Sequence, residues 1–367
     1  MAKRKRTALF HTSGRLSYRL RSFLALLRSS AYVSFRRSLH GPLLPVWSWR
    51  LEFGTHFLRR QMKTAFGMQD IQAGREYEDS LTLFSPAVAQ VSIEPASFIH
   101  DCTNNPGEQT GREIRGRWFI PIEAAPQATM LYLHGGGYAY YSKAHANLIA
   151  LVTIAANTKT YAPDYRLIPE HPYPAQLDDA LAAYRWLLES GVSPERLVVA
   201  GDSAGGNLTL ALLLALREAQ TPLPALAVCI SPWTDAGNSG ESMESNQPFD
   251  WPQKRMAEKW AEWLCNGSDP KDPHLSPIHA DLRGLPHIFI QAGETEILFD
   301  MIRAFADNAK RQGSDVVLEV WENMNHDFQA FGDGMPQSQA ALSHIGRVVR
   351  QYAVGVPEEA DLGELGL

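Results

Sequence analysis

The sequence predicts an α/β protein built on a mostly parallel β-sheet with helices on both faces. From about residue 111, strand-like segments alternate with helix-like segments, which is the order that βαβ units produce. Strand candidates such as Leu197–Asp202 are continuously apolar, as expected for strands buried on both faces. With 367 residues, of which 45% are hydrophobic and 20% charged, the chain can bury a large core. This composition excludes disordered, collagen-like and disulfide-framework proteins.

Seven segments are predicted as strands because they are β-branched, aromatic or leucine-rich runs bounded by Gly, Pro or Asp. They are Ile114–Ile122, Thr129–His134, Lys159–Tyr165, Leu197–Asp202, Ala225–Ser231, His287–Ala292 and Val316–Glu322. Five apolar-periodic stretches between them are predicted as helices, over 144–157, 175–190, 205–219, 298–312 and 336–352. Residues 1–110, which are basic and helical at first and then loop-like, do not fit this alternation, and neither do residues 233–284. Both segments are therefore expected to be additions around the sheet.

The charge of the chain is divided unevenly. Residues 1–63 hold fourteen Lys and Arg against a single acid, Glu52, which gives +13 and leaves −19 for the rest. Such a segment favours an anionic partner, which is nucleic acid, a membrane surface or the acidic body of the chain itself. Its Arg- and Ser-rich composition also fits an organellar transit peptide.

Apolar runs and cysteine spacing indicate where in the cell the protein is located. No apolar run approaches the roughly 20 residues of a membrane span, and no signal-peptide pattern follows the KRKR run at 3–6. Cys102, Cys229 and Cys265 form no CxxC pair, which favours a reducing compartment and excludes a cysteine-rich zinc module. We therefore expect a cytoplasmic protein with no metal or other cofactor, associated peripherally with a membrane through its basic segment.

The run GDSAGG (201–206) matches G-x-S-x-G directly after a predicted strand and before a predicted helix. A sharp strand-to-helix turn needs glycines where side chains would clash, and it lifts the serine hydroxyl clear of the sheet. The helix that follows presents free N–H groups to developing negative charge. This context indicates Ser203 as a nucleophile.

The run HGGG (134–137) follows another predicted strand. Consecutive glycines let the backbone approach a ligand closely and direct N–H groups into a pocket. An oxyanion hole requires such groups, together with the N–H of the residue after the nucleophile. Phosphate binding is a poor alternative because no G-K-[ST] or G-x-G-x-x-G follows.

A serine nucleophile needs a base that is held by an acid, and in this architecture both follow later strands in the order Ser, acid, His. His326 is the only histidine directly after a late strand, so it is the predicted base. Three acids follow the strand His287–Ala292, namely Glu294, Glu296 and Asp300. The residues alone leave all three open as the acid.

Together, HGGG, GDSAGG and the late NHDF (325–328) resemble the hormone-sensitive-lipase-like branch of the α/β-hydrolases, the bacterial family IV esterases. The segment YAPDYRLIPEHPYPAQLDD (161–179) is similar to that family's YRLAPEHPFPA, and DPHLSP (272–277) is similar to its DPxxSP element. The resemblance covers about 115–350 and implies an eight-stranded α/β-hydrolase sheet with a helical cap. It also implies the site residues Ser203 as nucleophile, His326 as base, and Gly135, Gly136 and Ala204 as donors of oxyanion-hole N–H groups.

The acid departs from the family pattern, which usually places Asp first in a D-x-L-x-D run after this strand. Here the first acid is Glu296. Because Glu keeps the carboxylate, and both Asp and Glu serve in this role across the fold, we assign Glu296 with Asp300 as the alternative.

The cap of the family is built from the N-terminal segment and a late insertion. We therefore divide the chain into a basic N-terminal helical cap part (1–75), a first core part (76–232), a cap insertion (233–265), a second core part with the acid and His (266–352) and an acidic flexible tail (353–367). Trp47, Trp49 and Trp251 are predicted to line the substrate pocket, although packing within the cap explains such tryptophans equally well.

The expected activity is hydrolysis of small or short-chain acyl esters, such as acetates or lactones, through a Ser-Glu-His triad and an acyl-enzyme. A serine amidase or peptidase on the same fold is the alternative. A non-catalytic receptor of this fold is disfavoured because such receptors lose the histidine, and His326 is present. The family resemblance suggests a homodimer, whereas no motif supports a nucleic-acid partner. Attraction between the basic segment and the acidic body is expected to explain part of the charge division.

Overall fold

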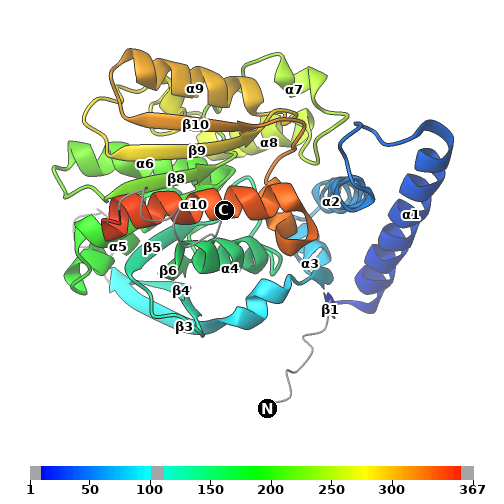
Figure 1. The fold of residues 1–367 in the computed structure, drawn as a ribbon, viewed down its shortest axis with the longest axis horizontal. Coiled ribbons are helices and arrows are strands. Elements are labelled where there is room, and N and C mark those ends of the chain that lie inside the picture. The colour runs from blue at the N-terminus through cyan, green and yellow to red at the C-terminus, as the bar shows by residue number, and fades with distance from the viewer. Residues whose placement is uncertain (1–9, 101–110, 357–367) are drawn as a thin grey trace.

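The computed structural model describes residues 10–100 and 111–356, and an eight-stranded sheet forms its centre (Figure 1). In spatial order the strands are β10 (Val316–Trp321), β9 (His287–Gly293), β8 (Leu226–Ile230), β7 (Leu197–Asp202), β5 (Ala128–Leu133), β6 (Thr158–Pro163), β4 (Arg112–Pro121) and β3 (Val91–His100). All neighbouring pairs from β10 to β6 are parallel, while β4 runs antiparallel to β6 and to β3. The sheet is therefore mostly parallel, as predicted.

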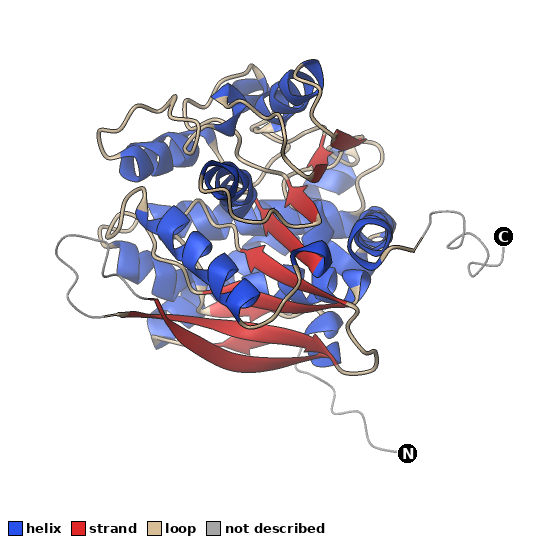
Figure 2. Ribbon diagram, turned by 90° about the vertical axis from the view of Figure 1, so that its left-hand side faces the viewer, coloured by secondary structure: helices blue, strands red, loops and turns tan. Residues whose placement is uncertain are grey.

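Helices cover the sheet on both faces (Figure 2). On one face lie α4 (His145–Ala156) and α10 (Pro336–Val349), and on the other lie α5 (Ala175–Glu189), α6 (Ala204–Glu218) and α9 (Phe299–Arg311). Alternate residues of a strand join the two cores: in β7, Val198 and Ala200 pack with α4 and α10, while Leu197 and Val199 pack on the other face. This double cover explains why the strands read as continuous apolar runs.

The seven predicted strands and five predicted core helices are present, with ends shifted by up to three residues. The prediction that the later part of residues 1–110 is loop-like was wrong, because 91–100 form the long strand β3. Pro95 interrupts the alternation of this segment. A proline donates no ladder hydrogen bond, but it is tolerated here since β3 is at the edge of the sheet and pairs on one side only.

The two segments outside the alternation are helical. The first holds α1 (Leu16–His40), α2 (Trp49–Phe66) and α3 (Ile71–Glu78), with α2 between α1 and the sheet in Figure 1. The second holds α7 (Ser242–Ser245) and α8 (Lys254–Cys265). A two-stranded ribbon of β1 (Phe10–Thr12) and β2 (Leu81–Leu83) connects the two ends of the first segment. The edge-on contact of Phe66 with Trp260 joins the segments, and we propose that together they form the cap. From residue 357 onward, the tail predicted over 353–367 lies outside the described residues.

Candidate active site

Ser203 occupies a tight turn between β7 and α6. Its φ of 53° and ψ of −117° are strained for an L-residue, as in a nucleophile elbow. The turn also needs glycine, because a Cβ on Gly205 would lie 1.9 Å from the Leu133 carbonyl oxygen, and one on Gly201 would lie 2.3 Å from the Gly205 oxygen. The Ser203 N–H donates to the Ile230 carbonyl at 2.9 Å. The predicted nucleophile is thus held at the carboxyl end of a central strand.

The HGGG run forms the loop after β5, packed against this turn. Gly136 and Gly137 have φ values of 95° and 61°, which glycine adopts without strain. His134 is fully buried and stacks between Tyr141 and Tyr165, with ring centroids 3.7 and 4.1 Å away. Burial lowers the pKa of His134 well below its ordinary value, so its ring is neutral and supports the loop by packing.

Backbone N–H groups of this loop and of the α6 N-terminus are available to a ligand. Those of Gly136, Gly137 and Ala204 have no hydrogen-bond acceptor among residues 10–100 and 111–356. The Gly135 N–H instead interacts with the buried Asp202 carboxylate, whose oxygen would lie 2.1 Å from a Cβ on Gly135. Of the predicted oxyanion-hole donors, Gly136 and Ala204 are therefore unengaged, while Gly135 is engaged and the unpredicted Gly137 is free.

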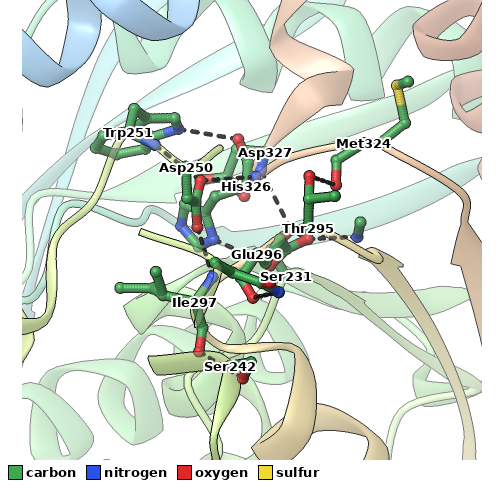
Figure 3. Close-up of polar contacts among 12 residues, drawn as sticks. Ser231, Ser242, Asp250, Trp251, Thr295, Glu296, Ile297, Met324, His326 and Asp327 are labelled. Atoms are coloured by element: carbon green, nitrogen blue, oxygen red, sulfur yellow. Dashed lines mark hydrogen bonds and ion pairs between the residues drawn. The ribbon is translucent and has the colours of Figure 1, made fainter. Parts of the chain in front are cut away.

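His326 and Glu296 contact each other at the carboxyl ends of the parallel strands, the end of the sheet where Ser203 follows β7 (Figure 3). The His326 Nδ1 atom lies 3.2 Å from the Glu296 Oε2 atom, and both side chains are buried. Glu296 follows β9 and His326 follows β10, and these strands are parallel neighbours whose carboxyl ends meet. An acid that orients a histidine base has this geometry.

The two other candidate acids have different contacts. Asp300 accepts a hydrogen bond from the Ser242 N–H at 2.9 Å and pairs with Arg303 one turn further along α9. Glu294 accepts a hydrogen bond from the Asn323 N–H at 3.0 Å. Of the three, Glu296 is the acid that contacts His326, which supports the assignment made from the sequence.

Two residues that hold this pair were missed by the sequence reasoning. The Ser231 hydroxyl, after β8, donates to Glu296 Oε1 at 2.7 Å. Asp250, in the cap insertion, accepts hydrogen bonds from the backbone N–H groups of Ile297 at 2.8 Å and His326 at 3.1 Å (Figure 3). Burial raises the pKa of Asp250 to about 7. Neither residue lies in a recognised motif. Each forms hydrogen bonds with a loop that is distant from it in the sequence, so no local pattern indicated it.

A second carboxylate faces the other nitrogen of His326, and it too was not predicted. The Asp327 Oδ2 atom lies 3.2 Å from His326 Nε2, and Asp327 has a φ of 52°. Burial by itself lowers the pKa of His326, but attraction of the protonated ring by Asp327 and Glu296 outweighs it and raises this pKa well above its ordinary value. Burial, followed by repulsion from Asp327, raises the pKa of Asp202 to about 7. The site thus holds several carboxylates around one histidine.

The three predicted pocket tryptophans have different environments. Trp251 borders the site, because its Nε1 donates to the His326 carbonyl at 2.9 Å and its ring centroid lies 5.3 Å from that of His326. Trp47 is 2% exposed and packs in a core cluster with Met324 and Phe328. Trp49 is 38% exposed and stacks on Phe53. Packing accounts for Trp47 and Trp49, and of the three tryptophans Trp251 is the one that borders the site.

Residues 130–330, more than half of the chain, match the family model described as alpha/beta hydrolase fold. The chain therefore belongs to the α/β-hydrolase fold family. It is 42% identical to an acetyl-hydrolase of Streptomyces hygroscopicus over 228 residues, which cover 60% of this chain and 75% of that protein. It is 31% identical to an ethyl acetate hydrolase of Pseudomonas putida over 305 residues, which cover 77% of this chain and 90% of that protein.

Similar solved structures indicate the branch of the α/β-hydrolase fold family to which the chain belongs. An esterase from the bacterial hormone-sensitive lipase family superposes with a TM-score of 0.66 and 31% identity, covering 90% of this chain and 98% of that one. A hormone-sensitive lipase from a metagenome library superposes with a TM-score of 0.68 and 30% identity, covering 81% of this chain and 97% of that one. Within the fold family, the protein is an ester-bond hydrolase of the bacterial hormone-sensitive-lipase branch.

Proposed function

We propose that this protein is a serine carboxylester hydrolase that acts on small or short-chain acyl esters, such as acetyl esters or lactones, through Ser203, Glu296 and His326. The observation that carries the proposal is the contact of Glu296 with His326 Nδ1 at the edge of the sheet where the strained Ser203 turn ends β7. The names of two relatives, acetyl-hydrolase and ethyl acetate hydrolase, favour a short acyl group.

In the proposed reaction, Glu296 holds the His326 ring through Nδ1, and Nε2, which contacts Asp327 in this structure, moves the protons. Ser203 Oγ attacks the ester carbonyl carbon while His326 Nε2 takes the hydroxyl proton. The N–H groups of Gly136, Gly137 and Ala204 stabilise the oxyanion. His326 then protonates the leaving alcohol, and the same nitrogen activates the water that hydrolyses the acyl-enzyme and restores the serine.

The described residues also form a cavity of about 690 Å³ between the first cap segment and α8. Its lining is mixed, with the apolar Phe66 and Trp263 beside charged residues of α8 such as Lys259. Ser203, Glu296 and His326 are not among its lining residues, so it is not assigned as the substrate pocket. A homodimer and a cytoplasmic location remain predictions.

Covalent labelling with a fluorophosphonate probe tests the nucleophile directly. The wild-type protein should be labelled and should hydrolyse p-nitrophenyl acetate, whereas Ser203→Ala should lose labelling and at least about 10³-fold in kcat/KM. Ser190→Ala, which removes an exposed hydroxyl, is the matched control and should behave as wild type. Turnover at the wild-type rate in Ser203→Ala would refute the proposal.

A series of p-nitrophenyl esters graded by acyl length, with matched anilides, tests the substrate class. Activity should be highest for acetate to butyrate and low for the anilides, because the site is proposed to act on short esters. Faster turnover of the anilides would indicate the amidase alternative instead.

A further inference from the structure

Helix α1 turns most of its large apolar side chains away from the protein, while Tyr18 and Leu26 pack inward. The residues that it buries are small: Ser22, Ala25, Ser29 and Val33. On its opposite side lies a set that we call the outer stripe, whose members are 47–64% exposed: Leu16, Leu20, Phe23, Leu24 and Leu27. At about 100° per residue, these five side chains fall within an arc of roughly 100°. The apolar face of this helix is therefore the outward face.

This orientation is the reverse of that in an ordinary surface helix, which buries its large apolar residues. Two further large apolar residues of α1, Phe35 and Leu39, are 66% and 61% exposed. Figure 1 shows α1 at the right-hand edge of the molecule, held to it through α2. Several large apolar side chains exposed on one helix face usually mark an interaction site.

The charges beside the outer stripe indicate the kind of partner. At about 100° per residue, Arg19 and Arg28 fall on its two borders. Both are exposed, and neither pairs with a carboxylate of the residues that the structure describes, whereas Arg36 and Arg37 both pair with Glu52. No Asp or Glu precedes Glu52 in the sequence. The stripe is thus apolar with basic borders and holds no acid of its own, while Arg15, just before Leu16, pairs with Glu76 at 3.1 Å.

We propose that the outer stripe of α1 docks on the surface of an anionic lipid membrane. Its leucine and phenylalanine side chains enter the interface between headgroups and acyl chains, while Arg19 and Arg28 contact lipid phosphates. A second copy of the chain is the competing occupant. In a two-fold symmetric pair, however, both copies would bring the same basic borders and no acid on the stripe to pair with them, so charge complementarity favours the lipid.

Vesicle flotation of the full chain tests this docking surface. The wild-type protein should float with vesicles of phosphatidylcholine containing about 30% phosphatidylglycerol, and much less with phosphatidylcholine alone. Leu20→Gln combined with Leu27→Gln should lower the partition coefficient at least about tenfold, and so should Arg19→Gln combined with Arg28→Gln. The matched control is Ile99→Gln combined with Ile122→Gln, which removes two residues of similar or greater exposure elsewhere, at 68% and 62%.

Hydrolysis of p-nitrophenyl acetate in the absence of vesicles should be unchanged in these variants, which shows that they are folded and separates docking from catalysis. Absence of wild-type binding to the anionic vesicles would overturn the proposal. Binding of the Leu20→Gln, Leu27→Gln variant, called the stripe variant, at the wild-type level would also overturn it. A wild-type dimer in sedimentation equilibrium that becomes a monomer in the stripe variant would instead assign the stripe to self-association.

Discussion

Asp327 Oδ2 lies 3.2 Å from His326 Nε2, on the opposite side of the ring from the Glu296 contact. The predicted base therefore has a carboxylate at each nitrogen, and the buried acids Asp202 and Asp250 lie close enough to interact with it. Burial alone would lower the pKa of His326, but the carboxylates raise it well above its ordinary value. Because only the neutral ring accepts a proton, kcat/KM should rise with pH along a limb above about pH 6.5.

The variant Asp327→Asn should move this limb to lower pH, since it removes a negative charge next to Nε2. Initial rates on p-nitrophenyl acetate from about pH 5 to pH 10 measure the shift. Asp333→Asn changes an exposed acid six residues further along the chain and should leave the profile in place. An unchanged limb in Asp327→Asn would show that Asp327 does not set the protonation of the base.

The variant Glu296→Gln should lower kcat by roughly 10³- to 10⁴-fold, because an amide cannot stabilise the imidazolium that forms in the reaction. Asp300→Asn should stay within about threefold of wild type, because an amide oxygen can still accept the Ser242 hydrogen bond. Steady-state kinetics on the purified variants decide between the two acids. A larger loss in Asp300→Asn than in Glu296→Gln would reverse the assignment.

The variant Gly205→Ala should cost more than about 3 kcal/mol of unfolding free energy or prevent folding, because its Cβ would lie 1.9 Å from the Leu133 oxygen. The Leu133 and His134 carbonyl oxygens that this Cβ would meet both belong to the backbone, so a rotamer change cannot relieve the clash. Gly334→Ala, where nothing lies within 4 Å, should stay within about 0.5 kcal/mol of wild type. Denaturant unfolding measures both, and equal stabilities would contradict the packing described for the turn.

The variant Glu52→Gln should loosen α1, because Glu52 is 4% exposed and accepts hydrogen bonds from both Arg36 and Arg37. Removing this charge from two partly buried guanidinium groups should cost about 2–4 kcal/mol locally. Hydrogen exchange of α1 amides reports the change. The matched control is Glu76→Gln, which removes an exposed pair with Arg15 and should cost at most about 1 kcal/mol. Equal exchange in the two variants would count against a structural role for Glu52.

Much of the architecture could be predicted because local sequence encodes it. The strands next to GDSAGG and HGGG are apolar, the glycines stand where the turns need them, and His326 directly follows a late strand. Strand β3 was missed because Pro95 breaks its alternation. Only its place at the sheet edge makes that proline acceptable.

By itself, the sequence determined the α/β class, the ester-hydrolase branch and the candidate residues Ser203 and His326, since each rests on a contiguous motif or a periodic pattern. Tertiary structure decided which acid contacts His326, and it brought Ser231 and Asp250 into contact with this pair. It also turned the adjacent Asp327 toward His326 Nε2. It also decided that α1 exposes its leucines, although the same residues would suit a buried face. Contacts between loops that are distant in the sequence, and the choice of which helix face is covered, depend on how the whole chain packs.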